Sequence, residues 1–381
     1  MPRERRFEID WLRVLAVLWL LPYHCARAFD TRQVFYAESG SKSPFLSNLL
    51  MAWTEPWHMP ILFLLAGAST FFALQFRSAG QYVGERAKRL LVPFFFGVLL
   101  IVPPQVYVGL VTHSGYPGSF FRWYPQFFRL NEDLSGYATG NFTPAHLWFI
   151  LFLFLFALLA LPLFLWLRRP SGQRFVERLS RLVRWPGVLF LFATPIVGTQ
   201  RLPDLGGQNP FSYLVWFILG FLVVSHDRFD RAIDRIRLPA LVLGPVFLAA
   251  FYLIRYVDAE ILWRAPDVFW STLFPFMAWS TLLAALGYGR RFLHRTNRFL
   301  SYASAAAYPF YVLHQTVIIL VAWLVIGWRL EAGAGYLVLL TLATVTTWLC
   351  YELLVRRWRP IRFLFGMKPR TAKPRASSSP S

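Results

Sequence analysis

The sequence predicts an all-α, polytopic membrane protein, a bundle of about ten transmembrane helices. Of its 381 residues, 56% are hydrophobic and only 15% are charged, whereas soluble proteins carry roughly 25% charged residues. Apolar runs long enough to cross a bilayer as helices recur along the chain. Strand-like alternation of apolar and polar residues is absent, which disfavours a membrane β-barrel.

Ten apolar segments define the expected helices. They cover residues 11–29, 57–76, 90–111, 145–167, 187–200, 210–225, 238–256, 267–288, 303–327 and 334–355. Most Lys and Arg residues then fall in the N-terminus, the alternate loops and the C-terminal tail, so the positive-inside rule places both termini in the cytoplasm. The segment 187–200 is short, but deleting it would put the basic loop 226–237 on the wrong side. We expect a membrane domain over 1–365 and a disordered basic, Pro- and Ser-rich tail over 366–381.

The formal net charge of +20 has its explanation in this topology. In a soluble protein it would indicate nucleic acid, but here the basic residues are scattered over membrane-adjacent loops. The lipid bilayer is therefore the expected partner, and nucleic acid is not. The sequence contains no phosphate-binding loop, dinucleotide fingerprint or zinc spacing, so no metal is expected.

The first segment carries two ionisable residues, Arg13 and His24, inside an apolar run. Eleven steps of about 100° end about 20° past three full turns, so both side chains share one helix face, about 16 Å apart along the axis. Ionisable groups at this depth are costly unless they have partners or line a cavity, which makes them functional candidates. The alternative is that both simply hydrogen-bond to neighbouring helices. Asp10 either orients Arg13 or satisfies free amides at the helix start.

The start of the second segment, WTEPWHMP, places Glu55 and His58 near the outer surface. Their simplest interpretation is an interfacial position within an aromatic belt. Further along, the small residues 67–69 allow close approach of another backbone or of a ligand, and helix packing is the simpler explanation.

A basic cluster, Arg86, Lys88 and Arg89, precedes the third segment on the expected cytoplasmic side. Such clusters ordinarily determine topology. They also suit a phosphate site, because basic donors at a helix start combine with its positive dipole end.

Two further histidines lie in apolar segments. His146 opens the fourth segment near the outer face, and His314 lies about mid-membrane in the ninth. For His314 a buried polar network and a place along a substrate tunnel are equally open.

These residues give the chain a resemblance to acyltransferase family 3, the bacterial membrane O-acyltransferases. The matching features are IDWLR followed by His24, the stretch FLLAGAS, and Arg86-Ala87-Lys88-Arg89. The second departs from the family's usual Phe-Phe-x-x-Ser-Gly-like form, with Leu64 and Ala66 at the differing positions. WHMP, HLWFI and YPFYVLHQT resemble the branch of glucan biosynthesis protein C, a proposed glucan succinyltransferase.

The resemblance implies a multi-pass enzyme of the bacterial inner membrane. It would move an acetyl or succinyl group from cytoplasmic acyl-CoA (acetyl-CoA or succinyl-CoA) to a hydroxyl of a periplasmic carbohydrate. The basic cluster would hold the donor, Arg13 would engage its polar atoms, and His24 would act as general base or become transiently acylated. Acceptor binding would fall to Glu55, His58, His146 and His314.

The main alternative is a transporter or flippase of an acyl donor or a lipid-linked saccharide. Intramembrane His and Arg residues and Pro-broken helices also occur in such proteins. The sequence leaves open the acyl group, the acceptor and the oligomeric state.

Overall fold

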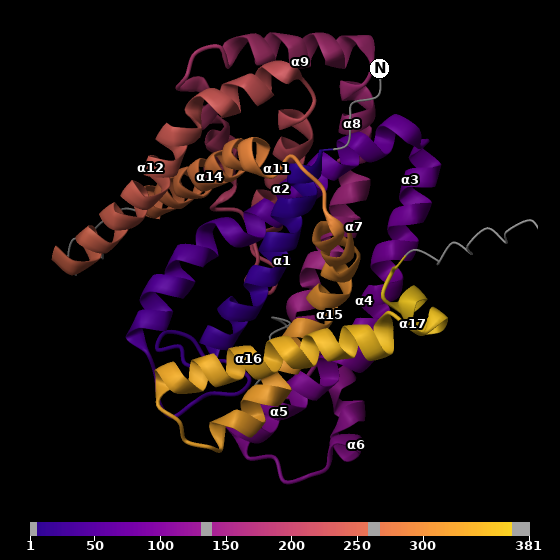
Figure 1. The fold of residues 1–381 in the computed structure, drawn as a ribbon, viewed down its shortest axis with the longest axis vertical. Helices are drawn as coiled ribbons and strands as arrows, with labels where there is room; N and C mark the ends of the chain where they lie inside the picture. Colours follow the sequence, from indigo (N-terminus) through magenta and orange to yellow (C-terminus); the bar gives the residue numbers. More distant parts are fainter. Residues whose placement is uncertain (1–5, 131–138, 258–266, 368–381) are drawn as a thin grey trace, which may run out of the picture.

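The computed structural model describes residues 6–130, 139–257 and 267–367, and these residues are almost entirely helical (Figure 1). Within them there is no β-strand, only an isolated bridge between Leu205 and Gln208. The α-helices are α1 (Phe7–Arg27), α2 (Ala52–Phe76), α3 (Ala79–Arg86), α4 (Val92–Phe96), α5 (Val102–Ser114), α6 (Phe120–Trp123), α7 (Trp148–Leu159), α8 (Leu161–Leu167), α9 (Pro170–Leu182), α10 (Thr194–Thr199), α11 (Pro210–Val223), α12 (Asp227–Val257), α14 (Asp267–Phe292), α15 (Arg298–Ile326), α16 (Ala332–Cys350) and α17 (Arg359–Leu364). The π-helical segments are η1 (Leu46–Met51), η2 (Ala87–Leu91), η3 (Gly97–Ile101) and η7 (Tyr351–Val355), and the 3₁₀ segments are η4 (Tyr124–Phe128), η5 (Ala145–Leu147) and η6 (Val188–Ala193).

The chain is a multi-pass membrane protein by the length and composition of its helices. In the described part of the chain, five helices are long and apolar enough to cross a membrane: Phe7–Arg27, Leu46–Phe76, Ala79–Ser114, Arg298–Ile326 and Ala332–Val355. The pair Ala145–Leu159 and Leu161–Leu167, bent by 48°, makes a sixth if it counts as one span. The predicted count of ten and the orientation of the termini stay predictions.

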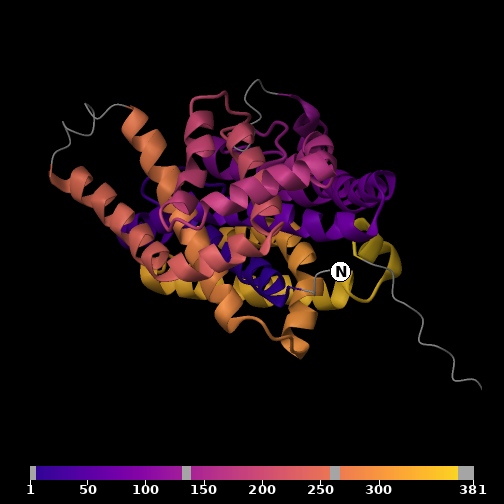
Figure 2. The ribbon, with the colours of Figure 1, turned by 90° about the horizontal axis from the view of Figure 1, so that it is seen from above.

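The other predicted segments are helical as well. Val188–Thr199 and Pro210–Val223 are apolar but shorter than a full span. Helices α12 and α14 pack side by side and project from one side of the molecule (Figures 1 and 2). Of the predicted tail, 368–381 lies outside the described residues, as do 131–138 of the long loop 112–144.

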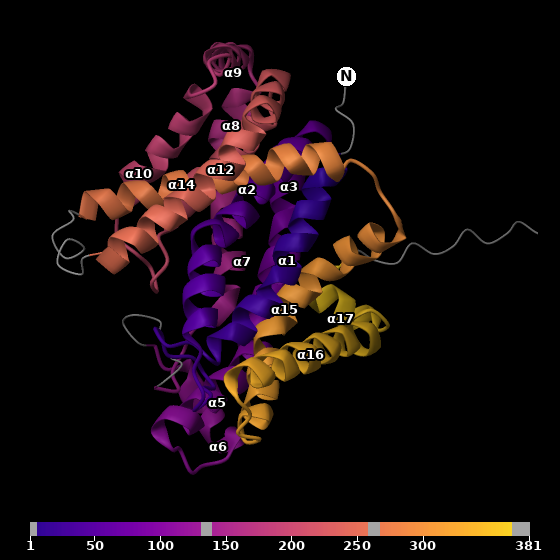
Figure 3. The ribbon, with the colours of Figure 1, turned by 60° about the vertical axis from the view of Figure 1, so that its left-hand side comes forward.

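Helix α1 lies inside the bundle, and α15 packs beside it (Figure 3). Of the most apolar window of α15, 72% of the residues are buried, whereas the figure for the last span, which includes α16, is 28%. Helix α16 is therefore peripheral, and α1 and α15 form the centre on which the site is built.

Helices α2 and α11 pack backbone against backbone through two glycines. A Cβ atom on Gly67 would lie 1.8 Å from the carbonyl oxygen of Phe217, and one on Gly220 would lie 1.9 Å from that of Leu64. No side chain larger than hydrogen fits at either position. The prediction of close helix packing is therefore confirmed at Gly67.

Ion pairs fix the start of α1 against α12 and α14. Arg6 pairs with Asp230 at 2.9 Å and also with Glu8. Arg290, at the end of α14, reaches Asp230 at 2.9 Å and Asp234 at 3.1 Å. This network holds the end of α1 from which Arg13 projects.

Candidate active site

Helix α1 presents Arg13 and His24 to neighbouring helices. Arg13 Nη2 donates to Ser69 Oγ of α2 at 2.6 Å, and the His24 ring lies 5.0 Å from the His314 ring of α15. Neither side chain simply faces lipid. The two residues therefore mark two ends of one helix, each with partners on other helices.

The Arg13 end is held by hydrogen bonds on both sides of the guanidinium. Nη1 donates to Asp10 Oδ1 at 3.1 Å, so Asp10 orients Arg13. Ser69 Oγ accepts the second bond and itself donates a hydrogen bond to the Leu65 carbonyl at 2.7 Å. The Arg13 side chain is still 36% exposed, which leaves part of its charge open to a ligand. Sequence reasoning considered Ser69 only for its small size.

The predicted basic cluster surrounds this end. Arg86 Nη2 donates to Thr70 Oγ1 at 3.4 Å and lies over the Tyr82 ring at 5.1 Å, while Tyr82 OH and Thr70 Oγ1 share a 3.0 Å hydrogen bond. Arg86 and Arg89 lie near enough to Arg13 for their positive charges to repel its guanidinium. Converging cations of this kind repel one another unless an anion joins them.

Lys88 is less constrained than Arg86 and Arg89. Arg89 pairs with Glu85 at 3.3 Å and donates to the Gly366 carbonyl at 3.4 Å. Lys88 is exposed and has no hydrogen bond or ion pair with any described residue. Lys88 is therefore free to turn, whereas Arg89 is held by Glu85 and the Gly366 carbonyl.

At the other end of α1, three imidazoles from separate segments meet. His314 lies between His24 of α1 and His146 of η5, with ring centroids 5.0 Å and 5.1 Å away. Ala145, just before His146, has φ = 44°, a left-handed conformation that is uncommon for alanine. Such backbone strain is typical of functional sites because the surrounding structure must hold it.

The hydrogen bonds of these imidazoles leave ring nitrogens open. His146 Nε2 donates to the Val312 carbonyl at 3.0 Å, and His314 Nδ1 donates to the Tyr311 carbonyl at 2.6 Å. His146 Nδ1, His314 Nε2 and His24 Nδ1 are buried and have no partner among the described residues. Because the two nitrogens opposite these donors carry lone pairs, the cluster offers hydrogen-bond acceptors to a substrate hydroxyl.

Tyrosines and amides of α15 surround the cluster. Tyr311 OH donates to the His146 carbonyl, and Gln315 Nε2 donates to Gln105 Oε1 of α5 at 3.0 Å. The Tyr308 hydroxyl, one turn before Tyr311, is buried without a partner among the described residues. Gln105 was missed from the sequence, although a glutamine inside an apolar run is a usable signal.

The remaining two predicted residues are committed to other contacts. His58 is buried, and its Nε2 donates to the Ala16 carbonyl of α1 at 2.7 Å. Glu55 pairs with Arg32 at 3.2 Å. His58 therefore joins α2 to α1 close to His24, and Glu55 anchors the loop that follows α1.

That loop covers His24 with Phe35. The two rings lie 6.4 Å apart and stack, and His113 Nε2 donates to the Phe35 carbonyl at 2.6 Å. Glu38 accepts from the Phe35 amide at 2.9 Å and from Lys42 at 2.7 Å. Burial alone would raise the pKa of the Glu38 carboxyl, but these hydrogen bonds outweigh it and lower the pKa below 4.5.

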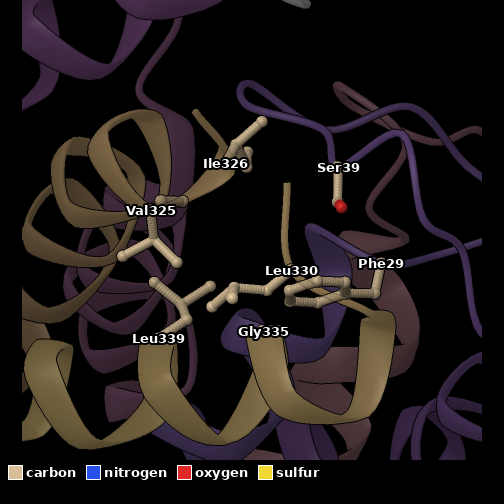
Figure 4. A pocket seen from close by; sticks show the side chains of 8 residues that line it. Phe29, Ser39, Val325, Ile326, Leu330, Gly335 and Leu339 are labelled. Atoms are coloured by element: carbon tan, nitrogen blue, oxygen red, sulfur yellow. The ribbon is translucent and has the colours of Figure 1, made fainter. Parts of the chain in front are cut away.

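A small cavity of about 10 Å³ opens next to the end of α1, which is room for one water (Figure 4). Phe29, Ser39 and Leu339 are among its lining residues. A larger cavity lies between α9 and α12. Neither reaches Arg13 or His24, and the buried side chains of Val17 and Leu20 lie between those residues on α1. A passage joining the two ends stays a prediction.

The described residues include no group of three His, Cys, Asp or Glu side chains arranged to hold a metal ion. The family model described as "Acyltransferase domain" matches residues 6–352, nearly the whole chain. The protein belongs to acyltransferase family 3. No curated protein and no solved structure matches it. As a family 3 protein it is a membrane acyltransferase.

Proposed function

We propose that this acyltransferase takes an acetyl or succinyl group from acyl-CoA at the Arg13 end of α1. The acceptor is a hydroxyl of a carbohydrate, a glucan in particular, at the His24 end. The proposal rests on the difference between the two ends of α1. One end has the partly exposed guanidinium of Arg13 near other cations, and the other has the imidazole cluster, in which ring nitrogens lack hydrogen-bond partners among the described residues.

The proposed orientation follows from charge. The helices that coincide with the ten apolar segments would all cross or enter the bilayer, with the basic loops and both termini in the cytoplasm. Arg86 and Arg89 then face the acyl-CoA pool, and His24 faces the periplasm of a bacterial inner membrane. The carbohydrate acceptor is reached from that outer side.

The donor would be held by its phosphates. Arg86, Lys88 and Arg89 supply charge-assisted hydrogen bonds to the nucleotide end of CoA, which are stronger than those between neutral groups. Arg13, fixed by Asp10 and Ser69, would engage polar atoms further along the donor. The pantetheine arm would then extend toward His24.

His24 would act as general base. Its neutral imidazole takes the proton of the acceptor hydroxyl while the oxygen attacks the thioester carbonyl. The C–S bond then breaks, the ester forms, and CoA leaves as a thiol by taking the proton back. In the alternative sequence His24 attacks first, CoA leaves, and the acceptor hydroxyl displaces the imidazole from the acyl group.

Within the acceptor site, His146 and His314 are the best-placed contacts. Their open ring nitrogens can accept hydrogen bonds from sugar hydroxyls. Glu55 and His58, which already have protein partners, would support the site through the Arg32 loop and through α1.

A transporter or flippase of an acyl donor or lipid-linked saccharide is the second candidate, favoured by the 48° break between α7 and α8. Purified protein in nanodiscs separates the two. We expect acetyl-CoA or succinyl-CoA to raise the melting temperature, and addition of a glucan oligosaccharide to release CoA. Uptake of either substrate into proteoliposomes without acyl transfer would instead identify a transporter.

A further inference from the structure

A second basic site lies away from the proposed active site. Helix α9 and the start of α12 lie side by side at the end of the molecule where α1 begins (Figures 1 and 3). Between them is a cavity of about 190 Å³. Its lining residues are Ser180, Val183, Arg184, Arg228, Arg231, Ala232 and Arg235. Four of these seven residues are arginines.

The protein neutralises these arginines only in part. The carboxylate of Glu177 lies 3.8 Å from Arg228 but also pairs with Arg181 at 3.3 Å. Arg235 donates to the Arg184 carbonyl at 2.8 Å, and Arg231 has no hydrogen bond or ion pair with any described residue. Like charges around one cavity repel each other unless an anion binds among them.

The arrangement of α12 shows why Asp230 and Asp234 do not compensate the positive charge of the cavity. Arg228, Arg231 and Arg235 recur at helical spacing and share the face that lines the cavity. Asp230 and Asp234, at the intervening positions, pair with Arg6 and Arg290 elsewhere. Asp230 and Asp234 therefore do not neutralise the arginines that line the cavity.

The surroundings indicate that the anion belongs to a lipid. Phe175, Leu182 and Trp185, on α9 and just after it, are about half exposed, and Arg184 lies over the Trp185 ring at 5.3 Å. Basic side chains beside exposed aromatic and aliphatic ones are typical of a helix lying in the membrane interface. We propose that this cavity binds the phosphate of an anionic phospholipid headgroup. It is a site separate from the donor cluster of Arg86 and Arg89.

The test uses the full chain in nanodiscs of phosphatidylcholine alone or mixed with phosphatidylglycerol. We expect phosphatidylglycerol to raise the melting temperature of the wild-type protein and to remain bound in native mass spectrometry. Arg231→Gln with Arg235→Gln should weaken this retention by about a hundredfold or more, because two charge-assisted hydrogen bonds are lost and each contributes about one to two factors of ten. Arg231→Glu alone should also weaken it, and it leaves the Arg235 bond to Arg184 intact.

The control is Arg178→Glu, an exposed arginine of α9 that does not line the cavity. It should keep the wild-type preference for phosphatidylglycerol. Equal lipid retention by wild type and both cavity variants would overturn the proposal. So would protection by inorganic phosphate or CoA in phosphatidylcholine nanodiscs that is lost in the cavity variants, because the site would then serve a soluble phosphate.

Discussion

The two ends of α1 differ in how far their polar groups are satisfied. At one end, Arg13 is bonded to Asp10 and Ser69, and Arg86 to Thr70. At the other, three imidazoles stand within about 5 Å of a neighbour, yet each keeps a buried ring nitrogen without a partner among the described residues. A buried polar atom without a hydrogen-bond partner destabilises the folded protein, so natural proteins keep such atoms mainly where a ligand supplies the missing partner.

From this difference we expect the Arg13 end to position the donor and the His24 end to carry out the chemical step. Side chains fixed by the protein hold a charged ligand in one place with little loss of entropy. Side chains with open nitrogens are available to a substrate hydroxyl and its proton. Substitutions at the Arg13 end should therefore change donor binding, and substitutions at the His24 end should change the rate of the chemical step.

The largest effect is expected at His24. His24→Ala should lower kcat for acyl transfer by about 10²- to 10⁴-fold, the usual contribution of a general base or nucleophile. The KM for acyl-CoA should change little, because the donor cluster is intact. Steady-state kinetics in nanodiscs measures both, and an unchanged melting temperature shows that the fold is kept. Wild-type kcat in a folded His24→Ala protein would reject the assignment.

Arg13→Ala should weaken donor binding by about tenfold to a hundredfold, the scale of a charge-assisted hydrogen bond, and it removes the ion pair between Arg13 and Asp10. Isothermal titration with acyl-CoA measures the change in Kd. Arg13→Lys is the matched control: it keeps the charge but cannot bond Asp10 and Ser69 as a planar fork, so it should recover only part of the affinity. Full affinity in Arg13→Ala would remove Arg13 from the donor site.

A smaller effect is expected from Arg86→Ala combined with Arg89→Ala. The pair should raise the KM for acyl-CoA about tenfold and leave the KM for the glucan unchanged, because phosphate contacts at an exposed site are screened by salt. High salt should reduce the difference between variant and wild type. Arg122→Ala combined with Arg129→Ala, two exposed arginines between the third and fourth predicted segments, is the control with the same loss of charge. A larger change in acceptor KM than in donor KM would contradict the assignment.

The smallest effect concerns the loop over His24. Glu38→Gln breaks the ion pair with Lys42 and should lower kcat by at most about fivefold, since exposed pairs contribute up to about 1 kcal/mol. The Glu38 pKa is lowered in the folded protein, so the pair is present above pH 4.5 and is lost as the pH falls through the lower value. The wild-type protein should therefore approach the variant only at acidic pH. If kcat of the wild-type protein and of Glu38→Gln shows the same pH profile both below and above pH 4.5, this loop does not contribute to catalysis.

Much of the centre of the molecule follows from the sequence. Helical spacing and the cost of buried charge single out Arg13 and His24, and the structure joins both to other helices. The small size of Gly67 predicts the packing of α2, and the apolar runs predict the position of each long helix. Local patterns are informative there because a membrane helix must satisfy its own backbone.

Contacts between distant segments could not be predicted in the same way. Periodicity does not reveal that His314 and His146 would meet His24, or that Phe35 would be held over it by His113. Nor does it reveal the π-helical segments within Ala79–Ser114, the first of which contains Lys88 and Arg89 and changes the direction of their side chains. These features depend on tertiary packing, in which several segments share one small space.

The most direct test measures from which side of the membrane the enzyme uses each substrate. Proteoliposomes with the protein in one orientation would receive acetyl-CoA or succinyl-CoA on one side and a glucan oligosaccharide on the other. We predict acylated glucan only when acyl-CoA is on the Arg86 side and the glucan on the His24 side. Product formed only when both substrates are on the same side would contradict an enzyme whose first helix separates donor from acceptor.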